Sequence, residues 1–438
     1  MTIENPWHSR PLDVHRWSDH PEAIALSNDL WDEYFADFAK EGSRGPKPKT
    51  PFRNQFRVLL LDLWMAWNED PDLSLGVAMG ETAWHPNSRY NALHISKKII
   101  PIIKELHAVG LIDLANGSYG GPHSLTNRTT RIRASTLLRE RFESSRIKPE
   151  IIVHHSDREV IILKDGDESN AHSKPIEYED TERTTEIRRR LRAYNALLAE
   201  TFIDIPILDH PYIEREIASG PQTGEVERIS TLPSKVFVRR IFSRGSWDLN
   251  GRFYGGWWQQ VDRKTRSKIF LNDVPTIEVD FKGLHVAILS NEKGVPIEGD
   301  PYLLTQMTIP GVPPALQRRL VKQLVLTAIN ATSIKSAFAA FRDGWPKGHY
   351  GKEMTNAELQ SLLDAFVRKH PHLEDSLGSD QGIRLMNLDS KIAERLINIY
   401  TARSIPILCV HDSFIVPYDQ TGRLKRVMPR AALGVIGH

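Results

Sequence analysis

The sequence predicts an α+β protein with two or three domains, on three observations. The chain has 438 residues, which is more than one hydrophobic core usually organises. Hydrophobic residues make up 40% of it and charged residues 26%, as in ordinary globular proteins. Segments with helical periodicity and short alternating segments typical of strands follow one another along the chain without an internal repeat.

The composition also excludes several classes of protein. The single cysteine, Cys409, excludes an internal disulfide and a cysteine-based zinc site. The N-terminus lacks the apolar core of a signal peptide, and the longest apolar run, at 58–67, is too short to cross a bilayer. We therefore expect a cytoplasmic protein with no membrane partner. Because the net charge is only +2, any affinity for nucleic acid must come from local clusters of the 57 lysines and arginines.

Residues 1–50 are predicted to form a polar N-terminal extension that ends in a linker, EGSRGPKPKTP. From Phe52 on, the pattern is helical. FRNQFRVLLLDLWMAW predicts one helix, and RYNALHISKKIIPIIKELHAVGLI, at 89–112, predicts a pair of short helices.

Two short strands joined by a glycine-rich loop are predicted next, in LIDLANG and RTTRIRAST. A helical pair followed by such a hairpin is the order of a winged helix-turn-helix DNA-binding domain, which we place at 51–145. Basic side chains of its helix and wing would contact phosphates. These side chains are Lys97, Lys98, Lys104, Arg128, Arg131 and Arg133. The alternative is an ordinary small domain with a solvated basic face.

The segment 146–232 is predicted to be a connector. EIIVHHSDREVIILKD alternates like a β-hairpin with its turn at Ser156–Glu159. A strongly basic helix follows, from Thr181 to about Glu200. It could line a nucleic-acid channel, or it could be a solvated helix held by pairs such as Glu186 with Arg190. The stretch around ASGPQTGEVE predicts a loop and a domain boundary near residue 232.

Four features of the remaining segment, 233–438, suggest chemistry. In the first, Asp248-x-x-Gly251-Arg252 opens a stretch rich in glycine and tryptophan, and Arg252 supplies a fixed guanidinium. In the second, an apolar strand ends at Asp280 just before a helix start, where α/β folds hold ligands and metals. Each also has a structural alternative, a buried turn for the first and a helix N-cap for the second.

The third feature is PPALQRRLVKQLVLTAINA at 313–331, which predicts a long apolar helix with Arg318, Lys322 and Asn330 within one face. An arginine one turn from a lysine suits a triphosphate, because the arginine can fork onto one phosphate while the lysine neutralises the next. The alternative is a pair of basic side chains that snorkel from an amphipathic helix.

The fourth feature is IPILCVHDSFIV at 405–416, which predicts two strands joined by a tight turn. His411, Asp412 and Ser413 lie at this turn. Taken alone, Asp412 would be a turn-capping aspartate.

In order and kind, these four features resemble the single-subunit RNA polymerases of phages and mitochondria and, less closely, the related family A DNA polymerases. The DxxGR element and the sequence HDSF at 411–414 are closer to the RNA polymerases, and MNLDSKIAERLINIY at 386–400 resembles a helix of the family's palm. The resemblance covers about residues 240–418. It implies a reduced right-hand fold, with Asp280 and Asp412 in the palm and the Arg/Lys helix in the fingers.

The resemblance also implies a reaction by two-metal-ion phosphoryl transfer. Asp280 and Asp412 would hold two Mg²⁺ ions, with Mn²⁺ as an alternative. Arg318 and Lys322 would grip the triphosphate of a nucleoside triphosphate, and Lys322 could also offer a proton to the leaving group. Arg252 would contact the nucleic-acid backbone. His411 would orient the primer end or Asp412.

Two positions depart from the family pattern. Eight residues past the lysine the family has Tyr-Gly, and this chain has Asn330-Ala331. Five residues past the first acid DNA polymerases have a glutamate, and this chain has His285. Both positions are expected to contact the nucleotide, so the choice between ribonucleotides and deoxyribonucleotides stays open.

The sequence thus predicts an enzyme, a nucleotidyltransferase that copies a DNA template into RNA or a primer. It would serve the replication or transcription of a plasmid, a phage or another mobile element. The alternatives are a DNA polymerase of the family A type, a replication initiator or repressor with a degenerate palm, and a metal-dependent nuclease or transposase. The sequence does not predict a protein partner.

Overall fold

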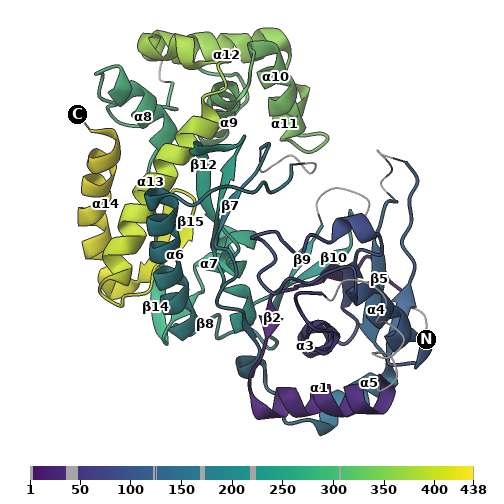
Figure 1. Cartoon of the computed structure of the whole chain (residues 1–438). Helices are drawn as coiled ribbons and strands as arrows, with labels where there is room; N and C mark the ends of the chain where they lie inside the picture. The colour runs from purple at the N-terminus through teal and green to yellow at the C-terminus, as the bar shows by residue number, and fades with distance from the viewer. Residues whose placement is uncertain are drawn as a thin grey trace. The chain divides into compact units, whose positions relative to one another are not determined.

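The computed structural model describes residues 3–35, 48–121, 124, 126–167, 173–217, 223–304 and 307–437 (Figure 1). Its contacts divide the chain into two compact units. Unit 1 comprises Met1–Glu159 and Ile207–Val236, and unit 2 comprises Val160–Pro206 and Phe237–His438. Both units combine helices with small, mostly antiparallel sheets, which agrees with the predicted α+β class.

Unit 1 is built around the buried helix α3 (Phe52–Glu69), which confirms the helix predicted there. A sheet of order β1-β3-β5-β4 packs against it, in which β3, β5 and β4 are antiparallel. Its other elements are β1 (Ser9–Pro11), β2 (Arg16–Trp17), α1 (Pro21–Tyr34), β3 (Ser74–Val77), α4 (Ile99–Ala108), β4 (Ile112–Ala115), β5 (Thr130–Ala134), α5 (Thr136–Ser144), β6 (Val153–His154), β9 (Tyr212–Glu216) and β10 (Val226–Ser230).

The predicted pair of helices at 89–112 is wrong in its first member. Residues 89–98 form turns, and only α4 is helical. The amide side chain of Asn91 accepts from the backbone N–H of Ile95 at 2.9 Å and donates to its carbonyl at 2.8 Å. A side chain that satisfies backbone groups in this way competes with helix formation. His94, between them, has a left-handed φ of 50°, which a helix excludes.

The segment predicted as an N-terminal extension contributes β1, β2 and α1 to unit 1. Trp31 of α1 stacks on Phe35 with a ring-centroid distance of 5.2 Å and meets the ring of Phe56 of α3 edge-on. Most of the predicted linker, at 41–51, lies outside the described residues.

The hairpin predicted at 150–165 is wrong. Its first strand, β6, pairs with β2 of unit 1, and its second, β7 (Ile161–Leu163), pairs with β11 (Arg239–Ser243) of unit 2. Alternation shows that each segment is extended but does not identify its partner. The stretch around 215–232 is also not simply a loop, because β9 and β10 pair with each other there and only the tip, 218–222, lies outside the described residues. The predicted connector is therefore divided between the two units.

Unit 2 contains a sheet of order β15-β16-β14-β13-β8 and a second sheet of order β12-β11-β7. Its other elements are α6 (Glu182–Glu200), β8 (Ile203–Asp204), β11 (Arg239–Ser243), β12 (Ser246–Tyr254), α7 (Arg263–Arg266), β13 (Phe270–Leu271), β14 (Val274–Asp280), α8 (Leu284–Glu292), α9 (Pro314–Asn330), α10 (Ile334–Asp343), α11 (Tyr350–Glu353), α12 (Asn356–Lys369), α13 (Gly382–Thr401), β15 (Leu408–Val410), β16 (Ser413–Pro417) and α14 (Thr421–Ile436).

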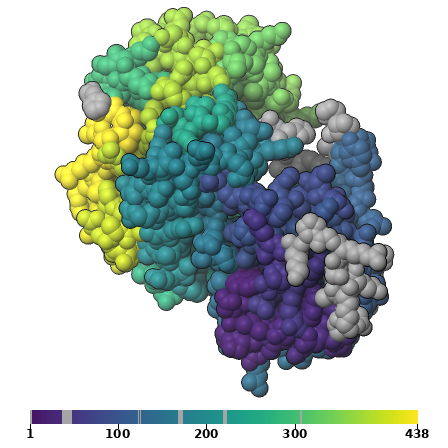
Figure 2. Space-filling model, in the orientation of Figure 1, coloured from purple at the N-terminus to yellow at the C-terminus, as the bar shows by residue number. Residues whose placement is uncertain are grey.

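The long helix α13 joins the parts of unit 2, since it packs against β12, α6, α8, α9 and α14 (Figure 1). On the surface shown in Figure 2, the teal segment that holds α6 borders the yellow C-terminal segment. The predicted basic helix is confirmed as α6, with Thr181 as its N-cap. Glu186 forms the predicted pair with Arg190 at 2.6 Å. Within the described residues, no helix has both the length and the apolar character needed to cross a membrane.

Candidate functional site

The strand register of unit 2 brings Asp280 and Asp412 to adjoining positions. β14 and β16 are antiparallel, and Asp280 lies opposite Ser413. Asp412 directly precedes Ser413, and its carbonyl oxygen accepts a hydrogen bond from the amide of Phe281 at 3.3 Å. The two acids come from distant parts of the chain, and they now stand at neighbouring strand ends.

A two-residue turn holds Asp412. β15 and β16 form the predicted hairpin, with Val410 opposite Ser413 and only His411 and Asp412 between them. His411 has a left-handed φ of 57°, in a position where such turns usually have glycine. A strained residue of this kind persists only when its surroundings hold it firmly. Here the following strand is fully buried, with Phe414 0% exposed.

The surroundings of Asp412 disfavour its charged form. Burial and the negative charge of Asp389 raise the pKa of the Asp412 carboxyl above its usual value, and the positive charge of Arg252 opposes them. A bound cation would reverse this penalty, because it favours the carboxylate.

Asp389 of α13 is the centre of a buried network that sequence reasoning missed. Its side chain is 0% exposed, and both carboxylate oxygens accept from Nε of Arg252 at 3.1 Å. Nε2 of His285, a predicted nucleotide contact, lies 2.9 Å from Asp389 Oδ2. Burial lowers the pKa of Arg252, but Asp389, together with Tyr254 and Asp412, raises it, and the net shift is upward. The signal in the sequence was an acid on the apolar face of a helix, since Leu385 and Ile392 on either side of Asp389 are also buried.

The DxxGR element is a bulge that aims Arg252 at this network. The register of β12 against β11 shifts around residues 250–252, and Gly251 has a φ of 88°. The carbonyl of Gly251 accepts from Nε of the buried Arg240 at 2.7 Å. The side chain of Arg252 is 15% exposed and is engaged by Asp389, so a nucleic-acid phosphate would have to compete with that carboxylate.

Glu278 is a second acid that sequence reasoning missed. It lies two residues before Asp280 on β14, hence on the same face of the strand. Its carboxylate binds the guanidinium of Arg266 through two bonds of 3.0 Å and accepts from Ser413 Oγ at 2.8 Å. Asp280 itself is half exposed and lies 3.8 Å from Arg263. α7, which supplies both arginines, therefore covers this face of β14.

His411 is held neutral. Burial, followed by the positive charge of Arg252, lowers its pKa to about 4. Its Nδ1 is buried without a hydrogen-bond partner among the described residues. The ring meets that of Tyr254 edge-on, with centroids 5.9 Å apart.

The predicted triphosphate helix is confirmed as a helix, α9. Arg318 donates to Asp300 at 2.5 Å, and Lys322 is exposed one turn further. Asn330 ends the helix, and its side-chain amide donates to the carbonyl of Leu326 at 2.6 Å. Tyr302 lies next to α9, with the guanidinium of Arg318 5.9 Å from the centroid of its ring. Burial and the negative charges of Asp300 and Asp412 raise its pKa, while Arg318 lowers it, so this hydroxyl is within electrostatic reach of both α9 and the turn.

The part of the chain that the structure describes holds no cluster of three or more His, Cys, Asp or Glu side chains arranged to bind a metal. Mg²⁺ does not require such a cluster, because proteins usually bind it through one or two carboxylates together with substrate phosphates. Asp280 and Asp412 supply two carboxylates at adjoining backbone positions, and Asp412 is a buried carboxyl whose charge a cation would stabilise.

In unit 1, several of the side chains predicted to contact DNA are instead bound to other residues of unit 1. Arg133 pairs with Asp72 at 2.9 Å and with Asp113, and Arg131 donates to Ser9 Oγ at 2.8 Å. The others are more open. Lys97 is exposed and pairs with Glu81, Lys98 lies over the ring of Phe52, Arg128 lies over the ring of Trp7, and Lys104 is exposed.

The chain matches no protein-family model, and it matches no curated protein. Its function therefore has to be inferred from the geometry of the site.

Proposed function

We propose that the protein is a DNA-templated nucleotidyltransferase that synthesises RNA or a primer. The observation that carries this proposal is the register of β14 and β16, which sets Asp280 beside Asp412. A helix with exposed or half-buried basic residues, α9, carries Arg318, and the charges of Arg318 and of Asp412 both act on the pKa of Tyr302. Phosphoryl transfer needs mainly positioning and neutralisation of charge, and these are the properties that such an arrangement supplies.

Asp280 and Asp412 would hold Mg²⁺, or Mn²⁺ in its place. When bound, the metal neutralises the triphosphate and lowers the pKa of the attacking 3′-hydroxyl. Lys322 would act as a point charge on the triphosphate and donate a proton to the leaving pyrophosphate. His411, neutral near pH 7, would hydrogen-bond the primer end through its unpartnered Nδ1 without adding a positive charge beside the two acids.

Unit 1 would hold the template. Its order of elements, α3, β3, α4, β4 and β5, with β3, β5 and β4 antiparallel, supports a winged helix-turn-helix domain. Lys97 is exposed just before α4 and Lys104 is exposed in the middle of α4, where a recognition helix would contact phosphates. A polymerase with its own DNA-recognition domain suits a plasmid, phage or mobile element that starts its own replication or transcription.

A second candidate is a DNA-binding replication initiator whose palm has lost activity. It is favoured by the engagement of two predicted substrate-binding arginines by protein carboxylates, Arg252 by Asp389 and Arg318 by Asp300.

Incubation with primed and unprimed DNA templates, Mg²⁺ and either rNTPs or dNTPs separates these functions. We expect labelled RNA, and dNTP incorporation would instead indicate a DNA polymerase. DNA binding without incorporation would favour the initiator, and shortened template strands would indicate a nuclease.

A further inference from the structure

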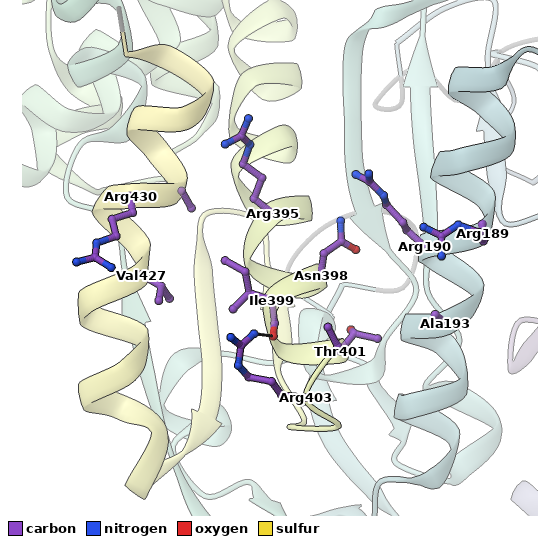
Figure 3. Close-up of a pocket in the computed structure, with 12 residues that line it drawn as sticks. Arg189, Arg190, Ala193, Arg395, Asn398, Ile399, Thr401, Arg403, Val427 and Arg430 are labelled. Carbon is purple, nitrogen blue, oxygen red and sulfur yellow. Dashed lines mark hydrogen bonds between the residues drawn. The ribbon is translucent and has the colours of Figure 1, made fainter.

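Unit 2 has a groove that the proposed reaction does not use. It has a volume of about 680 Å³ and lies between α6, the C-terminal half of α13 and α14 (Figure 3). Five arginines line it, four from these three helices and one, Arg403, from just after the end of α13, and its apolar lining includes Ile399, Val427 and Ala431. The arginines are Arg189, Arg190, Arg395, Arg403 and Arg430.

We propose that this groove binds single-stranded nucleic acid through its phosphates. None of the described residues that line it is acidic, and none is aromatic. Guanidinium groups match phosphate oxygens as forks, whereas base recognition in single strands depends on aromatic stacking. The groove therefore suits the backbone of a strand and should be indifferent to its sequence.

Only part of the positive charge in the groove is neutralised within the protein. Glu186 pairs with Arg189 at 2.7 Å and with Arg190 at 2.6 Å. Arg403 donates to the carbonyl of Ile399 at 2.8 Å, as Figure 3 shows. Within the described residues, no ion pair joins Arg395, Arg403 or Arg430 to an acid. These side chains are exposed, so their charge is available to a ligand.

A glycine of α14, Gly434, allows the side chain of Arg395 to lie against that helix. A Cβ added at Gly434 would collide with the guanidinium of Arg395. The guanidinium thus lies directly against the backbone of α14, at the edge of the groove, and a side chain at 434 would displace it.

The width of the groove favours a single strand over a duplex. α13 packs against both α6 and α14, and packed helices lie about 8–10 Å apart. The axes of α6 and α14 can therefore be at most about 20 Å apart, and helices about 10 Å across leave a gap of about 10 Å or less. A DNA duplex is wider than its own major groove, which is about 12 Å across, so a gap of this size does not admit a duplex.

The length of the groove fits a few nucleotides. Arg395 and Arg403 are separated by eight residues of α13 and its end, which is about 12 Å along the helix axis. At about 3.4 Å per phosphate, the spacing along the axis in one strand of double-helical DNA, this length faces about three or four phosphates, and an extended single strand would place fewer there. Asp389 of the candidate site lies six residues before Arg395, about 9 Å along the same axis.

The choice of nucleic acid over an acidic polypeptide rests on the proposed function, because both would complement the arginines. The test is therefore made without catalysis. Fluorescence anisotropy of a labelled single-stranded dT₁₂ is measured with the full chain in EDTA, over a series of salt concentrations. We compare the double variant Arg395→Ala/Arg430→Ala with Lys347→Ala/Arg368→Ala, which removes the same charge from exposed residues elsewhere in unit 2.

We expect the groove variant to bind at least tenfold more weakly than the control variant. The slope of log K against log salt should fall by about 1.4, since each single-strand phosphate contact contributes about 0.7. Gly434→Ala, which keeps every charge but displaces Arg395, should also weaken binding. Circular dichroism melting verifies that each variant is folded.

Two results would overturn the proposal. The first is that the groove variant and the control variant bind dT₁₂ equally well, or that the wild type does not bind dT₁₂ at all. The other is tighter, groove-dependent binding of poly-glutamate than of dT₁₂, which would assign the groove to an acidic polypeptide. Asp412→Asn separates this proposal from the proposed function, because it should abolish synthesis and leave dT₁₂ binding unchanged.

Discussion

The buried pair of Arg252 and Asp389 allows a quantitative prediction. Asp389→Asn leaves the Arg252 guanidinium, whose side chain is 15% exposed, without its counter-charge. Removing one member of a buried ion pair costs about 3–5 kcal/mol. The charge of Asp412 acts on Arg252 as well and compensates in part, so we expect a loss near the lower end, about 3 kcal/mol. Urea-induced unfolding, extrapolated to water, measures this loss.

Two further variants make the measurement specific. Asp248→Asn breaks an ion pair with Arg183 in which both side chains are well exposed, and it should cost less than about 1 kcal/mol. Arg252→Met/Asp389→Leu removes both charges of the buried pair and should be more stable than Asp389→Asn alone. Two results would refute the claim that Arg252 and Asp389 form a buried pair in which each charge depends on the other. One is a loss below about 1 kcal/mol for Asp389→Asn, and the other is a double variant that is less stable than Asp389→Asn.

Three other predictions concern different parts of the chain. Gly251→Ala should destabilise unit 2 by about 2 kcal/mol or more in thermal melts, because Gly251 has a φ of 88° and a Cβ there would collide with the ring of Phe242. Gly294→Ala, which has open space around its Cβ, should cost less. Burial lowers the pKa of His154 to about 4, below its value in the unfolded chain, so the unfolded chain binds more protons than the folded one between about pH 6.5 and 4. Unit 1 should therefore lose stability as the pH falls through that window, and His154→Gln should lessen this loss in urea titrations at several pH values. Lys322→Met should lower kcat for nucleotide incorporation by about 10²-fold or more, and an unchanged kcat would exclude its role as proton donor.

Local signals predicted the parts of the site that lie within one segment. The alternation of IPILCVHDSFIV predicted the hairpin that holds Asp412, and the prolines before an apolar helical pattern predicted α9. A turn and a helix are determined largely by neighbours in sequence, so their residues identify them.

Long-range packing explains what the sequence did not reveal. The same alternation failed at 150–165, because the partners of both strands, β2 and β11, lie far away in the chain. Asp389 looked like one polar residue among several on a helix, and only its burial against Arg252 identifies it as a central group. The arginine groove combines residues from α6, from the end of α13 and from α14 that are separated by up to 242 positions, from Arg189 to Ala431, and no local pattern predicts that they meet.

The proposed reaction depends on the two acids at the ends of β14 and β16, and one primer-extension measurement tests them most directly. With Mg²⁺, a DNA template and rNTPs, the wild type should extend or start a chain. Asp280→Asn and Asp412→Asn should each reduce synthesis at least about 10²-fold while template binding stays unchanged, since each variant keeps the shape of the side chain and removes one metal-binding charge. Unchanged synthesis by Asp412→Asn would contradict the proposed reaction.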